Sequence, residues 1–345
     1  MMKKMIAILL LLALSLTLLC ACKEDTSPSP DADQPNPDTS QTDTNNDTTP
    51  TEPESAVSNF EYETNSAGGI TITKYKGSET RVVVPAAIEG KNVTVIGYAA
   101  FAHNTTVTSV KIPANVTEIG RLAFDSCTAL TSVDLTQGLQ IIGVSAFFSA
   151  SALSSITLPS TLTEIGANAF LECSSLKQIA IPKATTTIGI RAFNLSGLET
   201  ITFESGSDLQ TIGEEAFSYS KVKNVALPSK VTSLGSYAFM GCADLESVSL
   251  STSLVSVGNS AFAGCTKLTS IVIPASVTNI TELAFDYCSA LTAVKFEGNA
   301  PANYEFVSDS PLPVGPANVN YTVYYHQGAT GFTSPTWCGY PTAIW

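Results

Sequence analysis

The apolar residues of this chain return with a fixed period of about 23 residues, and an Ala-Phe pair marks each return. A fixed period in this range predicts a solenoid, in which each repeat buries its apolar side against its neighbours. The paired phenylalanines are predicted to form one column in the core. They are Phe101, Phe124, Phe147, Phe170, Phe193, Phe217, Phe239, Phe262 and Phe285.

Each repeat is predicted to contain two extended segments. Leu268, Ile271 and Ile273 are spaced three and two apart, and the final alternation is the period of a strand with one buried face. Proline follows in five repeats, where a strand would stop pairing because proline lacks the backbone donor. The run 116–119 predicts the second, shorter segment.

Short helical or 3-10 turns are predicted between the two segments, because the apolar positions of Ala-Phe-x-x-Cys lie three and four apart. A glycine precedes each turn, and we expect it to hold a positive φ. These glycines are Gly97, Gly120, Gly143, Gly166, Gly189, Gly213, Gly235 and Gly258.

The recurring I-G-x-x-A-F signature and the L-x-x-I-x-L strand core resemble the BspA-type leucine-rich repeats of bacterial surface proteins. The resemblance covers about residues 60–345, although proline or a small polar residue replaces the asparagine that usually follows the strand. It implies a β-rich leucine-rich-repeat solenoid of nine repeats with N- and C-terminal caps.

The N-terminal flank predicts export and anchoring. Residues 1–21 combine a basic start with a short apolar run, as in a signal peptide. Leu19-Cys20-Ala21-Cys22 resembles a bacterial lipobox, which would place acyl chains on Cys22; a plain secretory signal is the alternative. Lys23-Glu24-Asp25 resembles the export signal of some surface lipoproteins.

Residues 22–56 predict a disordered acidic tether after the lipidated cysteine. They carry one lysine against nine acids and almost no apolar side chains, so they cannot offset their ordering entropy. The whole chain has a net charge of −13, which does not favour nucleic acid as a partner.

The ends of the repeat array, which runs over 95–297, differ in composition. Residues 57–94 predict an N-terminal β cap of two hairpin-like pieces. Residues 298–345 contain both tryptophans and predict an aromatic C-terminal cap. An alternative for this segment is a sugar- or wall-binding aromatic surface made of Trp337, Tyr340 and Trp345.

Cysteine and histidine positions do not favour catalysis. Five cysteines stand three residues after the repeat phenylalanine, where other repeats have Asn, Ala or Ser, so we expect a small buried slot holding thiols. A disulfide or a metal site would need the cysteines of neighbouring repeats to point toward each other, whereas equivalent side chains in stacked repeats are parallel. Cys338 is either free or paired with Cys288. His103 and His326 lie far apart, and we expect His103 to be solvated and the chain to be no enzyme, with no cofactor or metal.

The outward positions of the main strand are the predicted binding surface, because the resemblance implies that the concave sheet of the solenoid binds. We expect a broad, shallow contact from residues that are mostly small and neutral. The candidates are Ser109, Lys111, Ser132, Asp134, Ser155, Gln178, Thr200, Asn224, Ser247, Ser270 and Lys295.

Together these features predict a lipid-anchored protein of the bacterial outer membrane or cell surface. We expect an adhesin-like, non-catalytic module that binds a macromolecule of a host or neighbouring cell. The expected partner is an extracellular or envelope protein, or a glycan, with membrane contact only through the lipid. A structural scaffold of the envelope and a glycan-capture module are the alternatives.

Overall fold

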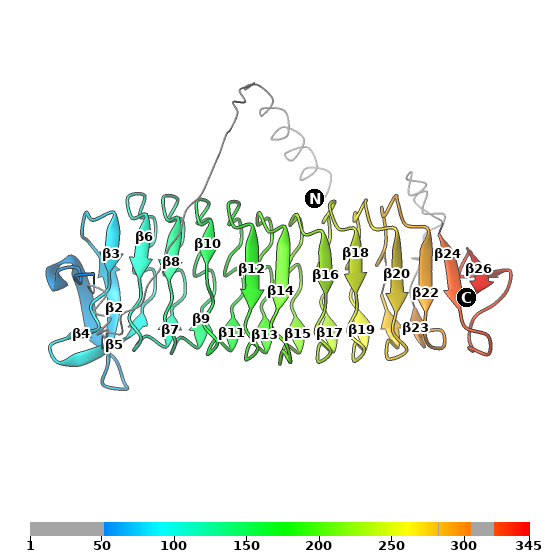
Figure 1. The fold of residues 1–345 in the computed structure, drawn as a ribbon, viewed down its shortest axis with the longest axis horizontal. Coiled ribbons are helices and arrows are strands. Elements are labelled where there is room, and N and C mark those ends of the chain that lie inside the picture. The colour runs from blue at the N-terminus through cyan, green and yellow to red at the C-terminus, as the bar shows by residue number, and fades with distance from the viewer. Residues whose placement is uncertain (1–51, 282, 305–320) are drawn as a thin grey trace, which may run out of the picture. The chain divides into compact units, whose positions relative to one another are not determined.

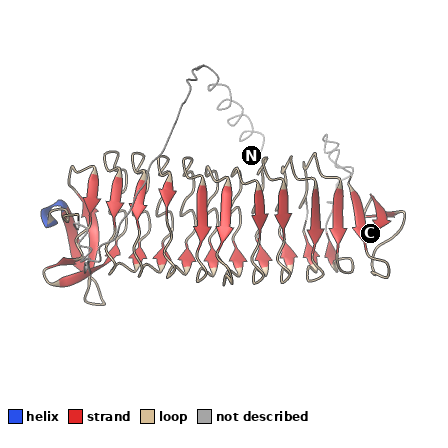
Figure 2. Ribbon diagram, in the orientation of Figure 1, coloured by secondary structure: helices blue, strands red, loops and turns tan. Residues whose placement is uncertain are grey.

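The computed structural model describes residues 52–281, 283–304 and 321–345. The predicted signal peptide, Cys22 and the acidic tether up to residue 51 lie outside these residues. Within them, the one helix is the 3-10 turn η1 (Val57–Asn59), and all other regular elements are strands (Figure 2). No helix in the described ranges is long and apolar enough to span a membrane.

The first layer of the body Glu52–Trp345 is a 13-stranded sheet, in which the strands after β5 are short. From β5 to β23 these strands stack in chain order and every pair is parallel (Figure 1). The sheet contains β1 (Phe60–Thr64), β2 (Ile70–Tyr75), β4 (Ala87–Ile88), β5 (Lys91–Ile96), β7 (Glu118–Ile119), β9 (Ile141–Ile142), β11 (Glu164–Ile165), β13 (Thr187–Ile188), β15 (Thr211–Ile212), β17 (Ser233–Leu234), β19 (Ser256–Val257), β21 (Asn279–Ile280) and β23 (Asn303–Tyr304).

The second layer contains the main strands of the repeats, and it is divided into sheets of four, two, two and five strands. Its strands are β3 (Arg81–Val83), β6 (Ser109–Lys111), β8 (Ser132–Asp134), β10 (Ser155–Ile156), β12 (Gln178–Ile181), β14 (Thr200–Phe203), β16 (Asn224–Ala226), β18 (Ser247–Ser249), β20 (Ser270–Ile273), β22 (Ala293–Phe296), β24 (Thr322–Tyr325), β25 (Thr336–Trp337) and β26 (Tyr340–Ile344). The predicted solenoid of two extended segments per repeat is therefore confirmed.

The period of the sequence sets the register of the longer strands. Ser109 lies opposite Ser132, and Val110 lies opposite Val133, so equivalent residues stack on equivalent residues. The valines are buried while Lys111 and Asp134 are exposed, which is the alternation expected of a strand with one face in the core.

The turn edge is the segment from each repeat glycine to the leucine after the cysteine slot. It contains the i→i−3 bonds of the expected 3-10 turns but no continuous helix. In residues 120–130, Phe124 N–H donates to the carbonyl of Ala146 in the next rung at 2.7 Å, while Asp125 N–H donates back to Leu122 at 3.0 Å. Successive residues thus alternate between bonds to the next rung and i→i−3 turn bonds. No helix continues through the segment because every second N–H is used between rungs.

The repeat glycines do not have the expected positive φ, so that expectation is wrong. They are needed for a close approach between rungs: a Cβ on Gly189 would lie 2.5 Å from the backbone N of Ala167. The positive φ values fall two residues later, on non-glycine residues such as Leu122 (φ 60) and Asn168 (φ 56).

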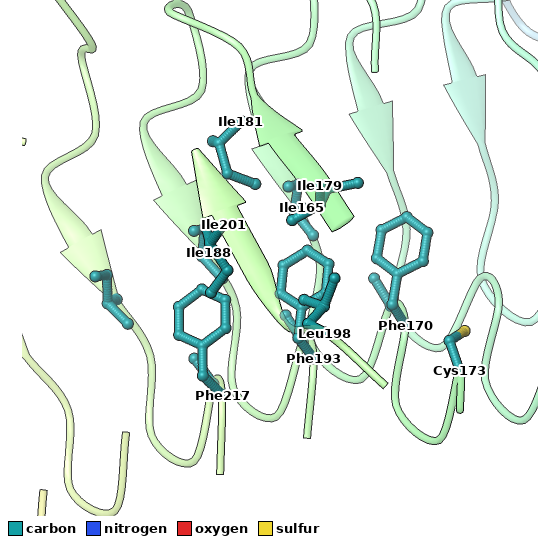
Figure 3. Packing of buried hydrophobic residues seen from close by; sticks show 14 of the residues in the cluster. Ile165, Phe170, Cys173, Ile179, Ile181, Ile188, Phe193, Leu198, Ile201 and Phe217 are labelled. Atoms are coloured by element: carbon teal, nitrogen blue, oxygen red, sulfur yellow. The ribbon is translucent and has the colours of Figure 1, made fainter. Parts of the chain in front are cut away.

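The predicted phenylalanine column is confirmed and fills the space behind the turn edge. Neighbouring rings lie 4.9 to 5.9 Å apart between centroids and are nearly parallel, at 1 to 19°. Figure 3 shows Phe170, Phe193 and Phe217 in this stack beside Ile165 and Ile188 of the first layer. Tyr75 extends the column by stacking on Phe101 at 5.1 Å.

The two ends of the body are built from irregular hairpins. Strands β1 and β2 pair antiparallel, and so do β4 and β5. At the other end β24 and β26 continue the second layer in parallel, and β25 pairs antiparallel with β26.

Candidate functional site

The candidate binding surface is the outward strand face, defined as the solvent-facing positions of the second layer. The rows predicted from the sequence lie in register, for example Gln178 beside Thr200 and Asn224 beside Ser247. Most of these side chains are exposed, and Ser247 Oγ donates to Asn224 Oδ1 at 2.5 Å across neighbouring rungs. The face is therefore a mainly polar surface with mostly small side chains, divided among the four sheets of the second layer.

The structure adds two residues to this face that the sequence analysis missed. Arg81 of β3 lies in register with Ser109, and Tyr324 of β24 lies in register with Lys295. Neither residue follows the 23-residue period, so the repeat pattern does not predict its place on this face. The signal that could have found them is the local alternation in Arg81–Val83 and Thr322–Tyr324. Arginine and tyrosine are favoured residues in binding hot spots.

A shallow hollow of about 190 Å³ lies at the β3 end of the face. Its charged lining residues are Glu52, Arg81, Lys111 and Asp134. Arg81 Nη2 and Glu52 Oε1 are 2.9 Å apart and form an ion pair. The two cations and two carboxylates balance, so this hollow has no strong preference for the charge of a ligand.

The candidate aromatic surface is not assembled as expected. Trp337 is only 2% exposed and packs edge-on against Phe296 at 5.7 Å, so including it in a surface was wrong. Tyr340 stacks on Tyr321 at 4.3 Å. These rings bury the apolar end of the last repeats, because β24 and β26 bring them over the core.

Trp345 is the exposed member of that set, at 41%. Its ring stacks on His326 at 4.8 Å, and Lys295 Nζ lies 4.8 Å from the ring centroid. The indole N–H also donates to the Phe296 carbonyl at 3.4 Å. The structure thus joins two candidates that the sequence kept apart, since Lys295 of the outward strand face and Trp345 are in contact.

The predicted cysteine slot is confirmed, and it contains thiols that are held by hydrogen bonds. All five repeat cysteines are buried. Each thiol donates to the carbonyl of a phenylalanine in the preceding rung, as Cys173 does to Phe147 at 3.2 Å. The Cys288 thiol makes the same bond to Phe262, which disagrees with a disulfide from Cys288 to Cys338.

Burial keeps the Cys127 and Cys242 thiols protonated at neutral pH. Desolvation raises the pKa of both Cys127 and Cys242 to about 12, although hydrogen bonds lower it in part. A thiol with a pKa this high is a poor nucleophile and a poor metal ligand at neutral pH. No group of three metal-ligating side chains is present among the described residues.

Most of the remaining titratable side chains face solvent, whereas Asp125, Tyr75 and Tyr321 are buried. His103 is exposed as expected, and its Nε2 lies 3.6 Å from Asp125 Oδ2. Glu118 and Glu164 stand one strand apart in the first layer, with Ile141 between them. An acid/base pair would need the two carboxylates to point at one reacting bond, and these two project from an open sheet.

Comparison with known families agrees with this architecture. The profile of the BspA type leucine rich repeat region (6 copies) matches residues 94–220 and 210–306, which together exceed half of the chain. The chain belongs to the BspA-type leucine-rich repeat family. None of the curated proteins matches it.

Solved structures of bacterial leucine-rich repeat proteins are similar to this BspA-type chain. One from Bacteroides ovatus ATCC 8483 is 28% identical, with a TM-score of 0.62 over 78% of this chain and 70% of that one. A leucine-rich cell surface protein of Faecalibacterium prausnitzii A2-165 is 24% identical, with a TM-score of 0.47 over 75% of this chain and 96% of that one. A leucine-rich repeat protein of T. pallidum is 27% identical, with a TM-score of 0.40 over 69% and 91% of the two chains.

Proposed function

We propose that this BspA-type protein is a non-catalytic binding module on the bacterial surface, anchored by lipid on Cys22. The observation that carries the proposal is the outward strand face. Its strands pair in register within each of the four sheets, and the first and last of these sheets extend the face beyond the repeats to Arg81 and Tyr324. The partner we propose is a macromolecule of a host or neighbouring cell.

The shape of this face favours a large partner over a small molecule. Small-molecule sites are concave and enclose most of the ligand, whereas the hollow beside Arg81 is shallow. A stable protein contact needs about 800 Å² from each partner. A sheet of many rungs supplies such an area without any rearrangement, which supports a broad macromolecular contact.

The buried chemistry supports a module without catalysis. The repeat thiols are shielded by the core, where burial raises the pKa of Cys127 and Cys242, and the two histidines are exposed on different elements. A nucleophilic enzyme needs a base within hydrogen-bond reach of its nucleophile. The ordered part of the site is instead a set of solvent-facing side chains on a rigid sheet.

Binding is tested with a matched pair of arginine substitutions. Thr200 and Thr211 are exposed threonines on the second and first layer, respectively. Wild-type protein is assayed for saturable binding to host cells, neighbouring bacterial cells and extracellular matrix proteins. We expect Thr200→Arg to weaken binding at least tenfold and Thr211→Arg to leave it unchanged. The absence of saturable binding, or equal loss in both variants, would contradict the proposal.

The cellular address is tested separately, by protease treatment of intact cells with lysed cells as the control. Cleavage in intact cells is expected, and a Cys22→Ser variant should move from the membrane fraction to the soluble fraction. Protection of the protein in intact cells would contradict a surface address. It would favour the envelope scaffold, which predicts cross-links only to envelope components.

A further inference from the structure

Two exposed tyrosines stand on the turn edge, outside the face that carries the proposed function. Tyr219 is 43% exposed and Tyr287 is 54% exposed. Each follows its repeat phenylalanine by two residues, so both occupy the same repeat position. The two rungs between them have glycine there, Gly241 and Gly264.

Tyr219 forms a flat platform on the neighbouring rung. A Cβ on Gly241 would lie 2.5 Å from both Cδ1 and Cε1 of Tyr219, so the ring rests directly against the glycine backbone. A side chain on Gly241 would displace the ring. One side of the ring is therefore held by the protein, while its exposure leaves another side in contact with water.

An open slot lies beyond this platform, on the next rung. A Cβ on Gly264 would meet only Gly241 Cα and N, each at 3.5 Å. Neither tyrosine ring fills the space above Gly264. The rungs here are 5.3, 5.6 and 5.9 Å apart along the phenylalanine column. The open backbone of Gly264 therefore lies between the rung covered by the Tyr219 ring and the rung that carries Tyr287.

Polar groups lie beside the platform. Lys221 follows Tyr219 by two residues, so their Cα atoms are at most about 7 Å apart. Lys221 is exposed and has no ion-pair partner among the described residues. Asp244 and Lys267 form an ion pair at 2.7 Å, and the charge of Lys221 also acts on Asp244. Lys221 therefore supplies a free ammonium donor close to the Tyr219 ring, and a charged pair lies within range of that ammonium.

We propose that this surface, made of Tyr219, Tyr287, Gly264 and Lys221, binds a carbohydrate chain. The apolar face of a sugar ring would stack on Tyr219, the slot over Gly264 would accept the chain, and Lys221 would donate to sugar hydroxyl or carboxylate oxygens. A peptide partner would favour a desolvated pocket around its anchor residue. An open aromatic platform with a polar margin matches a glycan, whose rings have both an apolar face and a polar edge.

The test uses the full-length protein and two soluble probes, a neutral β-glucan and a polygalacturonate, in affinity electrophoresis and calorimetry. We expect saturable binding of at least one probe, and the Lys221 ammonium predicts tighter binding of the acidic one. Tyr219→Ala should weaken binding about tenfold. The control is Tyr98→Ala, which removes an exposed tyrosine elsewhere on the turn edge.

A second variant fills the slot without removing a ring. Gly264→Asn retains a residue type that tolerates the φ of +75°, and its Cβ would make only ordinary contacts. We expect it to abolish binding while the melting temperature stays close to that of the wild type. Failure of both probes to bind, or equal binding by Gly264→Asn and wild type, would overturn the proposal. Thr200→Arg should bind the probes normally, so this result is independent of the outward strand face.

Discussion

The interior of each rung repeats nearly the same residues, whereas the residues of the outward strand face vary from rung to rung. Inside, the same phenylalanine, alanine and glycine return in nearly every rung, and the rings stack at 4.9 to 5.9 Å. Outside, serine, glutamine, threonine and asparagine succeed one another in register without a fixed identity. The stacking of rungs therefore depends on the interior residues, and the outward residues can vary to bind a partner without disturbing the stack.

The largest effect is expected where the interior column is broken. Phe170→Ala removes a fully buried ring between two stacked neighbours. We expect the free energy of unfolding to fall by about 3–5 kcal/mol, because a cavity is left in the core. Urea denaturation measures it, with Thr200→Ala as the outward control. A loss below about 1 kcal/mol would contradict the central role of the column.

A smaller loss is expected from crowding two rungs. A Cβ at position 189 would lie 2.6 Å from the carbonyl carbon of Gly166. Gly189→Ala should therefore destabilise the protein by about 1–3 kcal/mol.

The matched control for that variant is Ser145→Gly, which adds freedom at a φ of 55°. It should change stability by no more than about 1 kcal/mol. Thermal and urea unfolding compare the two variants. Equal effects would mean that close approach is not what selects glycine at position 189.

The thiol slot predicts a loss of stability in alkali. The pKa of Cys127 and Cys242 is raised from 9.0 to about 12 in the folded protein. Between these values the unfolded chain ionises and the native thiols do not, so the free energy of unfolding falls as pH rises. Each thiol should remove about 1 kcal/mol at pH 10 relative to pH 8.

Urea midpoints measured from pH 8 to 10 test this dependence. The variant with Cys127→Ala and Cys242→Ala should have a shallower pH dependence than wild type. An identical slope in the two proteins would show that these thiols do not contribute to it.

The smallest effect is expected at the exposed charges between rungs. Glu199 lies between Lys177 Nζ at 3.8 Å and Lys223 Nζ at 3.4 Å, all partly in solvent. Glu199→Gln should cost less than about 0.5 kcal/mol, because water screens exposed ion pairs. Denaturation in low and high salt measures this cost, and a loss comparable to that of Gly189→Ala would contradict the contrast between interior and exterior.

Much of the fold follows from the sequence because one periodic signal repeats. The phenylalanine spacing identifies the column, and the local alternation identifies the main strand. The turn edge is harder, since an i→i−3 turn and a short helix place apolar residues such as Phe124 and Cys127 at the same spacing. A recurring glycine is equally ambiguous, because it can indicate either a positive φ or a close approach between two backbones, as at Gly189.

The candidate site is predicted less completely, because the residues at its two ends do not follow the 23-residue repeat. Arg81 and Tyr324 reach the outward strand face only through pairing between strands that are irregularly spaced in the chain. Trp337 is typical of both a binding surface and a cap, and its burial depends on how β24 and β26 close the core. Whether such a side chain is buried or exposed depends on tertiary packing, which the local sequence pattern does not specify.

The most direct test measures both binding and stability in one triple variant of the outward strand face. Ser155→Arg, Thr200→Arg and Ser247→Arg place large charged groups on three separated rungs without touching the interior. We expect the variant to lose binding to the cells or matrix that retain wild-type protein, with a melting temperature within about 2 °C of wild type. Full binding at an unchanged melting temperature would show that recognition lies elsewhere on the molecule.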